Sequence, residues 1–261
     1  MGLFDTHTHY GDERFDEDRA ALLAALPLPS EICPCGVEAI LEQGWDLPSS
    51  EHALALAEQY PYIYAAAGVH PEECLSWNDQ TEAALRRLLS RPKTVALGEI
   101  GLDRHWAGES CPFEKQKEIF ARQLALGSEL GMPVCVHDRE AHGETFDLIR
   151  AHPGARGVLH AFSGEAELAR QYVNAGWYIG LGGVLTFKNA RAAVEVAGAV
   201  PLERVLLETD CPYMAPVPYR GERNDSRKAY AVAVKLAEIR GADVDEILAV
   251  TSENARTLFG I

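Results

Sequence analysis

Short runs of apolar and β-branched residues alternate with longer amphipathic stretches along the chain, about eight times. Most of these runs are continuously apolar, which is typical of parallel strands buried on both faces. Parallel neighbours need crossover connections, and the amphipathic stretches can supply them as helices. The predicted strands are residues 3–7, 31–33, 62–70, 94–99, 133–137, 157–160, 178–183 and 205–210.

The amphipathic stretch at residues 112–130 is the clearest predicted helix. It begins with Pro112, repeats apolar residues at spacings of three and four, and stops at Gly131. Candidate N-caps precede three further helices, and candidate C-terminal glycines follow two: Ser50, Ser163, Ser226, Gly176 and Gly241. These signals predict a helix after most of the strands.

Eight alternating strands and helices favour an α/β protein with a closed (β/α)₈ TIM-barrel fold. The chain has 261 residues, close to the roughly 250 that such a barrel needs. It contains no linker-like or low-complexity segment, so we expect one domain over residues 1–261.

The composition limits the cellular setting and the partners. No apolar run approaches the roughly 20 residues that cross a bilayer, and the N-terminus lacks a secretory signal, so a cytoplasmic protein without a membrane partner is predicted. The net charge of -15 disfavours tight nonspecific binding to duplex nucleic acid. A phosphate substrate would therefore need bound cations or a local basic patch. The oligomeric state is not indicated by the sequence.

Imidazole and carboxylate side chains follow the predicted strands, at the end of the barrel where catalytic groups collect. In an extended strand His7 and His9 point to the same side. The strand-end set is His7, His9, His70, Glu99, His137, His160, Glu208 and Asp210. Burying so many donors unpaired would be costly, and divalent cations would stabilise them. Taken singly, each of these residues could also be a solvated or salt-bridged strand end.

Nitrogen and oxygen donors without thiolate favour Zn²⁺, Mg²⁺, Mn²⁺ or Fe²⁺, and four imidazoles with two carboxylates from this set, six donors in all, exceed what one catalytic zinc requires. We therefore expect two divalent ions, with Glu99 as the candidate bridging carboxylate and a shared water that supplies hydroxide near neutral pH. Asp210, at a strand tip, is the expected acceptor of that water's proton. Glu208 is expected one layer deeper, orienting a histidine or a water.

Nine motifs distributed over residues 3–260 resemble the TatD family of metal-dependent hydrolases, within the amidohydrolase-like barrels. They are DTHTH, GVHP, GEIGLD, PVCVHDREA, HAFSG, GGVLTF, LLETDCPYMAP, RGERN and TSENARTLFG. The resemblance implies a TIM-type barrel with a divalent metal centre and phosphodiesterase activity. It implies in particular a DNase that trims single-stranded or frayed DNA ends from the 3′ side.

Position by position, the resemblance implies that His70 lies near the substrate phosphate and that Glu208 is the acidic partner in LLETD. Glu222 stands where the family often has a basic residue, and Arg104 where it often has an aromatic one. The metal ligands implied are His7, His9, Glu99, His137, His160 and Asp210.

The segment after the last predicted strand carries four basic residues: Arg220, Arg223, Arg227 and Lys228. They form either a phosphate-binding patch or an ordinary solvated helix start; in the first case Arg220 or Arg223, with His70, would hold the phosphate. Loop aromatics such as Trp106 are either base-stacking residues or simple packing.

The predicted reaction is attack of a metal-bound hydroxide on the phosphorus of a phosphodiester, with Asp210 taking the proton. Two other readings stay open. The same two-metal centre could hydrolyse a carbonyl substrate, such as an amide, a lactone or an aminoacyl ester. Alternatively, the barrel could bind metal or a partner without catalysis.

Overall fold

The computed structural model describes residues 2–261 and shows eight strands, β1 to β8, in a parallel sheet that follows chain order. The strands are β1 (Leu3–Thr8), β2 (Val37–Gln43), β3 (Ile63–Ala67), β4 (Thr94–Asp103), β5 (Val134–Arg139), β6 (Gly157–Leu159), β7 (Tyr178–Leu181) and β8 (Val205–Leu207). Helices alternate with them: α1 (Arg19–Ala25), α2 (Leu47–Gln59), α3 (Thr81–Leu89), α4 (Phe113–Leu130), α5 (His142–Ala151), α6 (Ala166–Asn174), α7 (Arg191–Ala199), α8 (Ala229–Arg240) and α9 (Val244–Phe259). The predicted (β/α)₈ fold class is confirmed.

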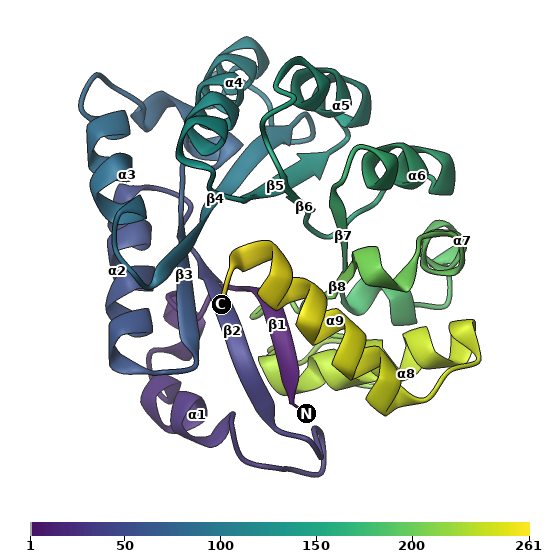
Figure 1. The fold of residues 1–261 in the computed structure, drawn as a ribbon. Helices are drawn as coiled ribbons and strands as arrows, with labels where there is room; N and C mark the ends of the chain where they lie inside the picture. The colour runs from purple at the N-terminus through teal and green to yellow at the C-terminus, as the bar shows by residue number, and fades with distance from the viewer. Residues whose placement is uncertain (1) are drawn as a thin grey trace. The chain divides into compact units, whose positions relative to one another are not determined.

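The described chain divides into two compact units. The first contains the chain up to Glu42 together with Ala161–Thr257. In it β1 pairs in parallel with β2, Asp5 lying opposite Ile40, and β7 pairs with β8, Gly180 lying opposite Leu206. Figure 1 shows β1 and β2 as neighbouring arrows near the N-terminus. Both strand pairs are almost entirely buried, as the continuous apolar runs predict.

The second unit contains Gln43–His160 and Leu258–Ile261. Here β3, β4, β5 and β6 pair successively in parallel. The register places Gly101 opposite His137 and Asp103 opposite Arg139, at the carboxyl ends of β4 and β5. The single-domain organisation of the whole chain stays a prediction.

The predicted strand at residues 31–33 is wrong, because the second strand of the sheet is β2 at Val37–Gln43. Residues 31–36 form turns, with Gly36 in the left-handed region at φ 70° and its N–H donating to the carbonyl of Cys33. The sequence of β2, VEAILEQ, contains two acidic residues that interrupt its apolar run. Glu42 is nevertheless buried, because its carboxylate accepts hydrogen bonds from Thr8, Tyr10 and Gly11.

Helix ends were predicted better at the C-terminus than at the N-terminus. Gly131 and Gly241 adopt left-handed conformations after α4 and α8, as expected for C-terminal glycines. Ser50, however, lies inside α2, whose N-cap is Asp46, and neither Ser163 nor Ser226 caps its helix. Within residues 2–261 no helix combines the length and apolar character that crossing a membrane requires.

Candidate metal centre

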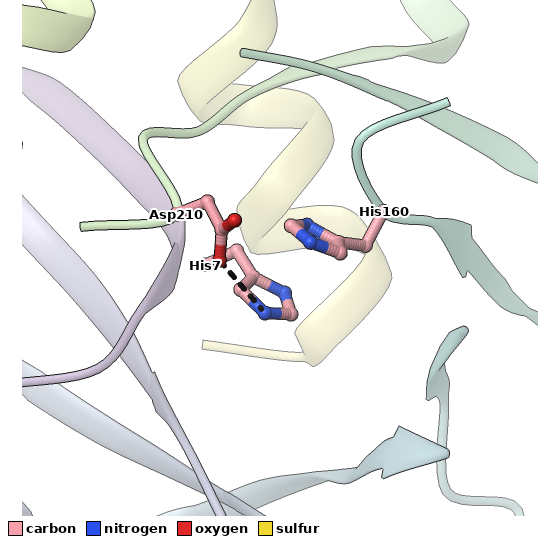
Figure 2. Close-up of side chains that lie close together, drawn as sticks. All are labelled: His7, His160 and Asp210. Atoms are coloured by element: carbon pink, nitrogen blue, oxygen red, sulfur yellow. Dashed lines mark ion pairs between the residues drawn. The ribbon is translucent and has the colours of Figure 1, made fainter. Parts of the chain in front are cut away.

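The first unit brings two histidines of the β1 segment to one carboxylate. Asp210 Oδ1 lies 3.3 Å from His9 Nε2 and 3.9 Å from His7 Nε2. Figure 2 shows the His7–Asp210 pair as a dashed line. Both imidazoles are buried and their ring centroids lie 5.0 Å apart. The strand-end spacing therefore places His7, His9 and Asp210 together within this unit.

Backbone hydrogen bonds hold this group in place. The Asp210 N–H donates to the His7 carbonyl, and the His9 N–H donates to the Cys211 carbonyl, each at 2.9 Å. The backbone of Asp210 has φ 59°, in the left-handed region that residues other than glycine rarely adopt. Such strain costs of order 1–3 kcal/mol and concentrates at functional sites.

Asp5 is a buried acid whose importance the sequence did not reveal. Its Oδ1 accepts the Thr209 N–H at 2.9 Å, and its Oδ2 accepts the Thr209 hydroxyl at 2.6 Å. Burial raises the pKa of Asp5 to about 7, although the hydrogen bonds from Thr209 work in the opposite direction. Asp5 thus fixes the residue between Glu208 and Asp210.

Glu42, at the end of β2, is a second such acid. It accepts hydrogen bonds from the Thr8 hydroxyl at 2.7 Å, the Tyr10 N–H at 2.9 Å and the Gly11 N–H at 2.7 Å. Burial raises the pKa of Glu42, and these bonds partly counteract it. The carboxylate therefore holds the chain on both sides of His9. These hydrogen bonds explain why an acid is buried within an apolar strand.

Glu208 lies fully buried, which agrees with its expected deeper position. Its Oε1 accepts the Ala161 N–H at 2.5 Å. Gly180 on β7 leaves room for it: a Cβ built there would come 2.8 Å from the carboxyl carbon of Glu208. A larger residue at position 180 would displace the Glu208 carboxylate.

In the second unit Glu99 is the common neighbour of three histidines. Its Oε1 lies 3.0 Å from His137 Nδ1, 3.7 Å from His70 Nε2 and 4.0 Å from His160 Nε2. Glu99 and His160 are buried, and His70 and His137 are partly buried. Carboxylate and imidazole groups of this kind are ligand types for divalent cations.

His137 also contacts Asp103, the last residue of β4, which the sequence reasoning missed. His137 Nε2 and Asp103 Oδ2 lie 3.0 Å apart. Burial works to lower the pKa of His137, but the hydrogen bonds to Asp103 and Glu99 outweigh it and raise the pKa to about 10. A ligating histidine commonly donates its second ring N–H to such a carboxylate, and Asp103 fits that role. The acid at the end of the GLD sequence that closes β4 was the feature from which this role could have been predicted.

His70 differs from the other histidines in its tautomer. Its Nδ1 accepts the Glu72 N–H at 3.3 Å, so in the neutral ring the proton resides on Nε2. Nε2 is the nitrogen that faces Glu99. His70 is thereby set up as a hydrogen-bond donor, and its expected position near phosphate stays a prediction.

The predicted basic cluster is largely paired with local acids. Arg223 binds Asp18 through two hydrogen bonds, of 2.7 and 2.6 Å. Arg220 is exposed and stacks on the Phe187 ring at 3.9 Å. Two further pairs are Arg227–Asp225 at 2.8 Å and Lys228–Glu222 at 3.2 Å. Of the two arginines predicted to bind phosphate, Arg220 is the more available.

The chemistry of the donors fits divalent cations. Atoms of the types that bind metals lie within 4.8 Å of one another on His70, Glu99 and His137, although His70 faces this group as a hydrogen-bond donor; His7, His9 and Asp210 supply the same types of atom in the other unit. All are imidazole nitrogens or carboxylate oxygens, the ligands of zinc and of harder divalent ions. Each unit therefore carries candidate metal-binding residues.

Comparison with known proteins agrees with this chemistry. The family model described as TatD related DNase matches residues 4–260. A metal-dependent hydrolase of Bacillus subtilis, YabD, is 37% identical over 99% of both chains, and a protein of Escherichia fergusonii named 3′-5′ ssDNA/RNA exonuclease TatD is 34% identical over 99% of both. The crystal structure of YjjV, a TatD homologue of Escherichia coli, matches 99% of this chain and 98% of its own, with 33% identity and a TM-score of 0.89.

Proposed function

The chain belongs to the TatD related DNase family of metal-dependent hydrolases, and on that premise we propose that it removes nucleotides from the 3′ ends of single-stranded or frayed DNA. The observation that carries the proposal is the convergence of buried or partly buried histidines on Asp210 in one unit and on Glu99 in the other. The exonuclease name of the E. fergusonii relative supports the choice of a nucleic-acid substrate.

We assign the metal-binding role to the six predicted donors, which lie within or shortly after parallel strands. Two divalent ions, Zn²⁺, Mg²⁺ or Mn²⁺, are proposed, and Glu99, the common neighbour of three histidines in its unit, would be among the residues that hold them. When bound, such ions supply Lewis-acid activation of water and neutralise charge on the phosphate. The donors are His7, His9, Glu99, His137, His160 and Asp210.

The protein's own groups then have separate tasks. Asp210 accepts the proton of the attacking water, because its carboxylate is partly exposed beside His9. His70 donates its Nε2–H to a phosphate oxygen, and Arg220 provides a guanidinium for the adjoining charge. Glu208, held by Ala161, keeps the Asp210 segment in position. Arg223 contributes less in this scheme because Asp18 already neutralises it.

The charge distribution favours strand ends over long duplexes. The net charge is -15, and Arg223, Arg227 and Lys228 are each paired with an acid. A long duplex would meet a repelling field and find few free cations to replace its counterions. A short unpaired end presents fewer phosphates and suits this surface better.

The proposal is tested by digesting single-stranded DNA labelled at either the 5′ or the 3′ end, with Mg²⁺, Mn²⁺ or Zn²⁺ added to chelator-treated protein. We expect mononucleotides to be released from the 3′ end, faster for single strands than for blunt duplex. Asp210→Asn should lower kcat by about 10²-fold or more, while Asp147→Asn, an exposed acid on α5, should leave it unchanged.

The same preparation is assayed on amide, lactone and aminoacyl-ester substrates. Turnover of one of these, lost in Asp210→Asn, together with inert oligonucleotides, would refute the nuclease proposal and favour carbonyl hydrolysis. Release from the 5′ end alone would refute the stated polarity.

A further inference from the structure

The loop that follows β4 presents a large aromatic side chain to solvent. Trp106 is 55% exposed, although tryptophan is usually well buried. Its ring meets His105 edge-on at 4.8 Å, and the guanidinium of Arg139, the last residue of β5, lies 5.7 Å from the ring centroid. An open aromatic face beside a cation is the arrangement on which single-stranded nucleic acids stack.

Hydrogen bonds fix the backbone of the loop that carries Trp106. The backbone N–H of Trp106 donates to Asp103 Oδ1 at 2.8 Å. The buried side chain of Gln116 on α4 accepts the Asp103 N–H at 2.8 Å and donates to the carbonyls of Asp103 and Cys111, both at 3.0 Å. Both ends of the loop backbone are thus anchored to α4, and the Trp106 side chain on this loop is largely exposed.

The same carboxylate connects this loop to the proposed metal ligands. Asp103 holds Trp106 through Oδ1 and His137 through Oδ2. Arg139 follows His137 by two positions on β5 and lies opposite Asp103 in the sheet register. Trp106 and Arg139 therefore lie next to His137 within the second unit.

Arg139 differs from the other cations of this loop region in lacking, among the described residues, a short side-chain ion pair like theirs. Arg104 pairs with Glu144 and His105 pairs with Glu140. Arg139 is exposed, and its charge acts on the carboxylates of Asp103 and Glu72, where it works against burial to lower the pKa of each. Its guanidinium is consequently available for a phosphate group.

From these contacts we infer that Trp106 and Arg139 form a nucleotide-binding subsite, in which Trp106 stacks on a base near the 3′ end and Arg139 binds a phosphate of the same strand. This inference rests on the proposed function and specifies how the substrate is held. Stacking does not depend on base identity or on the 2′-hydroxyl, so the subsite accepts DNA and RNA alike.

The base-stacking role is tested with two matched oligonucleotides, one intact and one whose 3′-terminal nucleotides are abasic. For Trp106→Ala we expect KM on the intact strand to rise about tenfold, with kcat within about twofold of the wild-type value. On the abasic strand the variant and the wild-type enzyme should have the same KM. Trp106→Phe keeps an aromatic face and should retain most of the affinity. Equal effects on both strands, or no effect, would overturn the stacking role.

The phosphate-binding role of Arg139 predicts an effect on both strands, whereas the stacking role of Trp106 predicts an effect on the intact strand only. Arg139→Ala should raise KM on intact and abasic strands alike and reduce the salt dependence of KM, because the phosphate remains in both. Two control variants should leave every constant unchanged: Arg91→Ala, which removes an exposed arginine from the loop before β4, and Leu130→Ala, which removes an exposed apolar side chain at the far end of α4. An unchanged KM in Arg139→Ala would overturn this role.

Binding without turnover separates this inference from the proposed function. The chain has four tryptophans, so quenching of fluorescence by single-stranded DNA or RNA is compared between chelator-treated wild type and Trp106→Phe. We expect quenching in the wild type and its loss in the variant. If the metal-loaded enzyme cleaves no strand but this quenching persists, the nuclease proposal fails and the subsite stands. If cleavage occurs but Trp106→Phe quenches as the wild type does, the subsite fails alone.

Discussion

Asp5 and Thr209 are joined by two hydrogen bonds, from the Thr209 N–H at 2.9 Å and from its hydroxyl at 2.6 Å. Asp5 lies two residues before His7 on β1, and Thr209 separates Glu208 from Asp210. One buried carboxylate therefore ties the strand that carries a proposed ligand to the segment that carries the proposed proton acceptor.

Asp5→Asn is expected to lower the free energy of unfolding by about 1–3 kcal/mol, because the amide can accept only one of the two Thr209 donors and leaves a buried partner unsatisfied. Urea unfolding of the chelator-treated protein measures the change. Thr209→Val removes the hydroxyl that donates to Asp5 Oδ2 and accepts the Cys211 N–H, so it should destabilise the protein as well. Wild-type stability in Asp5→Asn would show that the two bonds do not support the fold.

Asp103→Asn should weaken binding of divalent metal by about 10- to 100-fold, because His137 loses the carboxylate that orients its ring. Titration of metal against a competing chromogenic chelator gives the affinity. The matched control is Asp138→Asn on the same strand as His137, since Asp138 binds His142 at 2.9 Å. Equal losses in the two variants would mean that the effect is one of general charge and does not come from ring orientation.

Gly180→Ala should lower kcat by about tenfold or more with little change in stability, because the new Cβ pushes the end of the Glu208 side chain aside. Gly198→Ala in α7 is the control: a Cβ there meets open space, and the helix should gain about 0.5–1 kcal/mol. Steady-state kinetics and thermal unfolding of both variants distinguish a displaced carboxylate from a damaged fold. An active Gly180→Ala enzyme would argue against a positioning role for Glu208.

The strands and the histidines were predictable because both follow simple periodic rules. An apolar run that ends in histidine places that residue at the carboxyl end of a parallel strand, and within their units His7, His9 and His137 lie beside the predicted acids. Strand β2 was missed because its acids break the apolar run.

The supporting acids were not predictable, because their role depends on partners far away in the chain. Asp5 and Thr209 are 204 residues apart, and Asp103 and His137 are 34 apart. A single acid within or after a strand looks the same in the sequence whether it is solvated or buried among donors. The helix N-caps failed for a similar reason, since Asp46 and Ser50 are both acceptable caps and only the loop geometry selects Asp46.

The His142–Asp138 pair predicts a pH dependence of stability. The hydrogen bond to Asp138 raises the pKa of His142 above its ordinary value, against the smaller effect of burial. The stabilisation is therefore complete below the unfolded-state pKa of about 6.5 and is lost as the pH rises through the higher folded-state pKa. Urea unfolding of wild type and His142→Gln from pH 5 to 9 should show a difference that is largest at acid pH and shrinks at alkaline pH. A gap that widens toward alkaline pH would contradict the assigned pair.

The tautomer of His70 predicts that two histidines beside Glu99 respond differently to substitution. The His70 Nδ1 is occupied by the Glu72 N–H and its Nε2 carries the proton, so the neutral ring has no free lone pair to offer a cation. His70→Ala should leave metal affinity within about threefold and lower kcat/KM for a single-stranded oligonucleotide by about 100-fold, as expected for a lost donor to the phosphate. His137→Ala should instead lose metal affinity first, and its activity should recover partly at high metal concentration. Chelator-competition titrations and kinetics on both variants decide the matter, because a loss of metal in His70→Ala as large as in His137→Ala would make His70 a ligand.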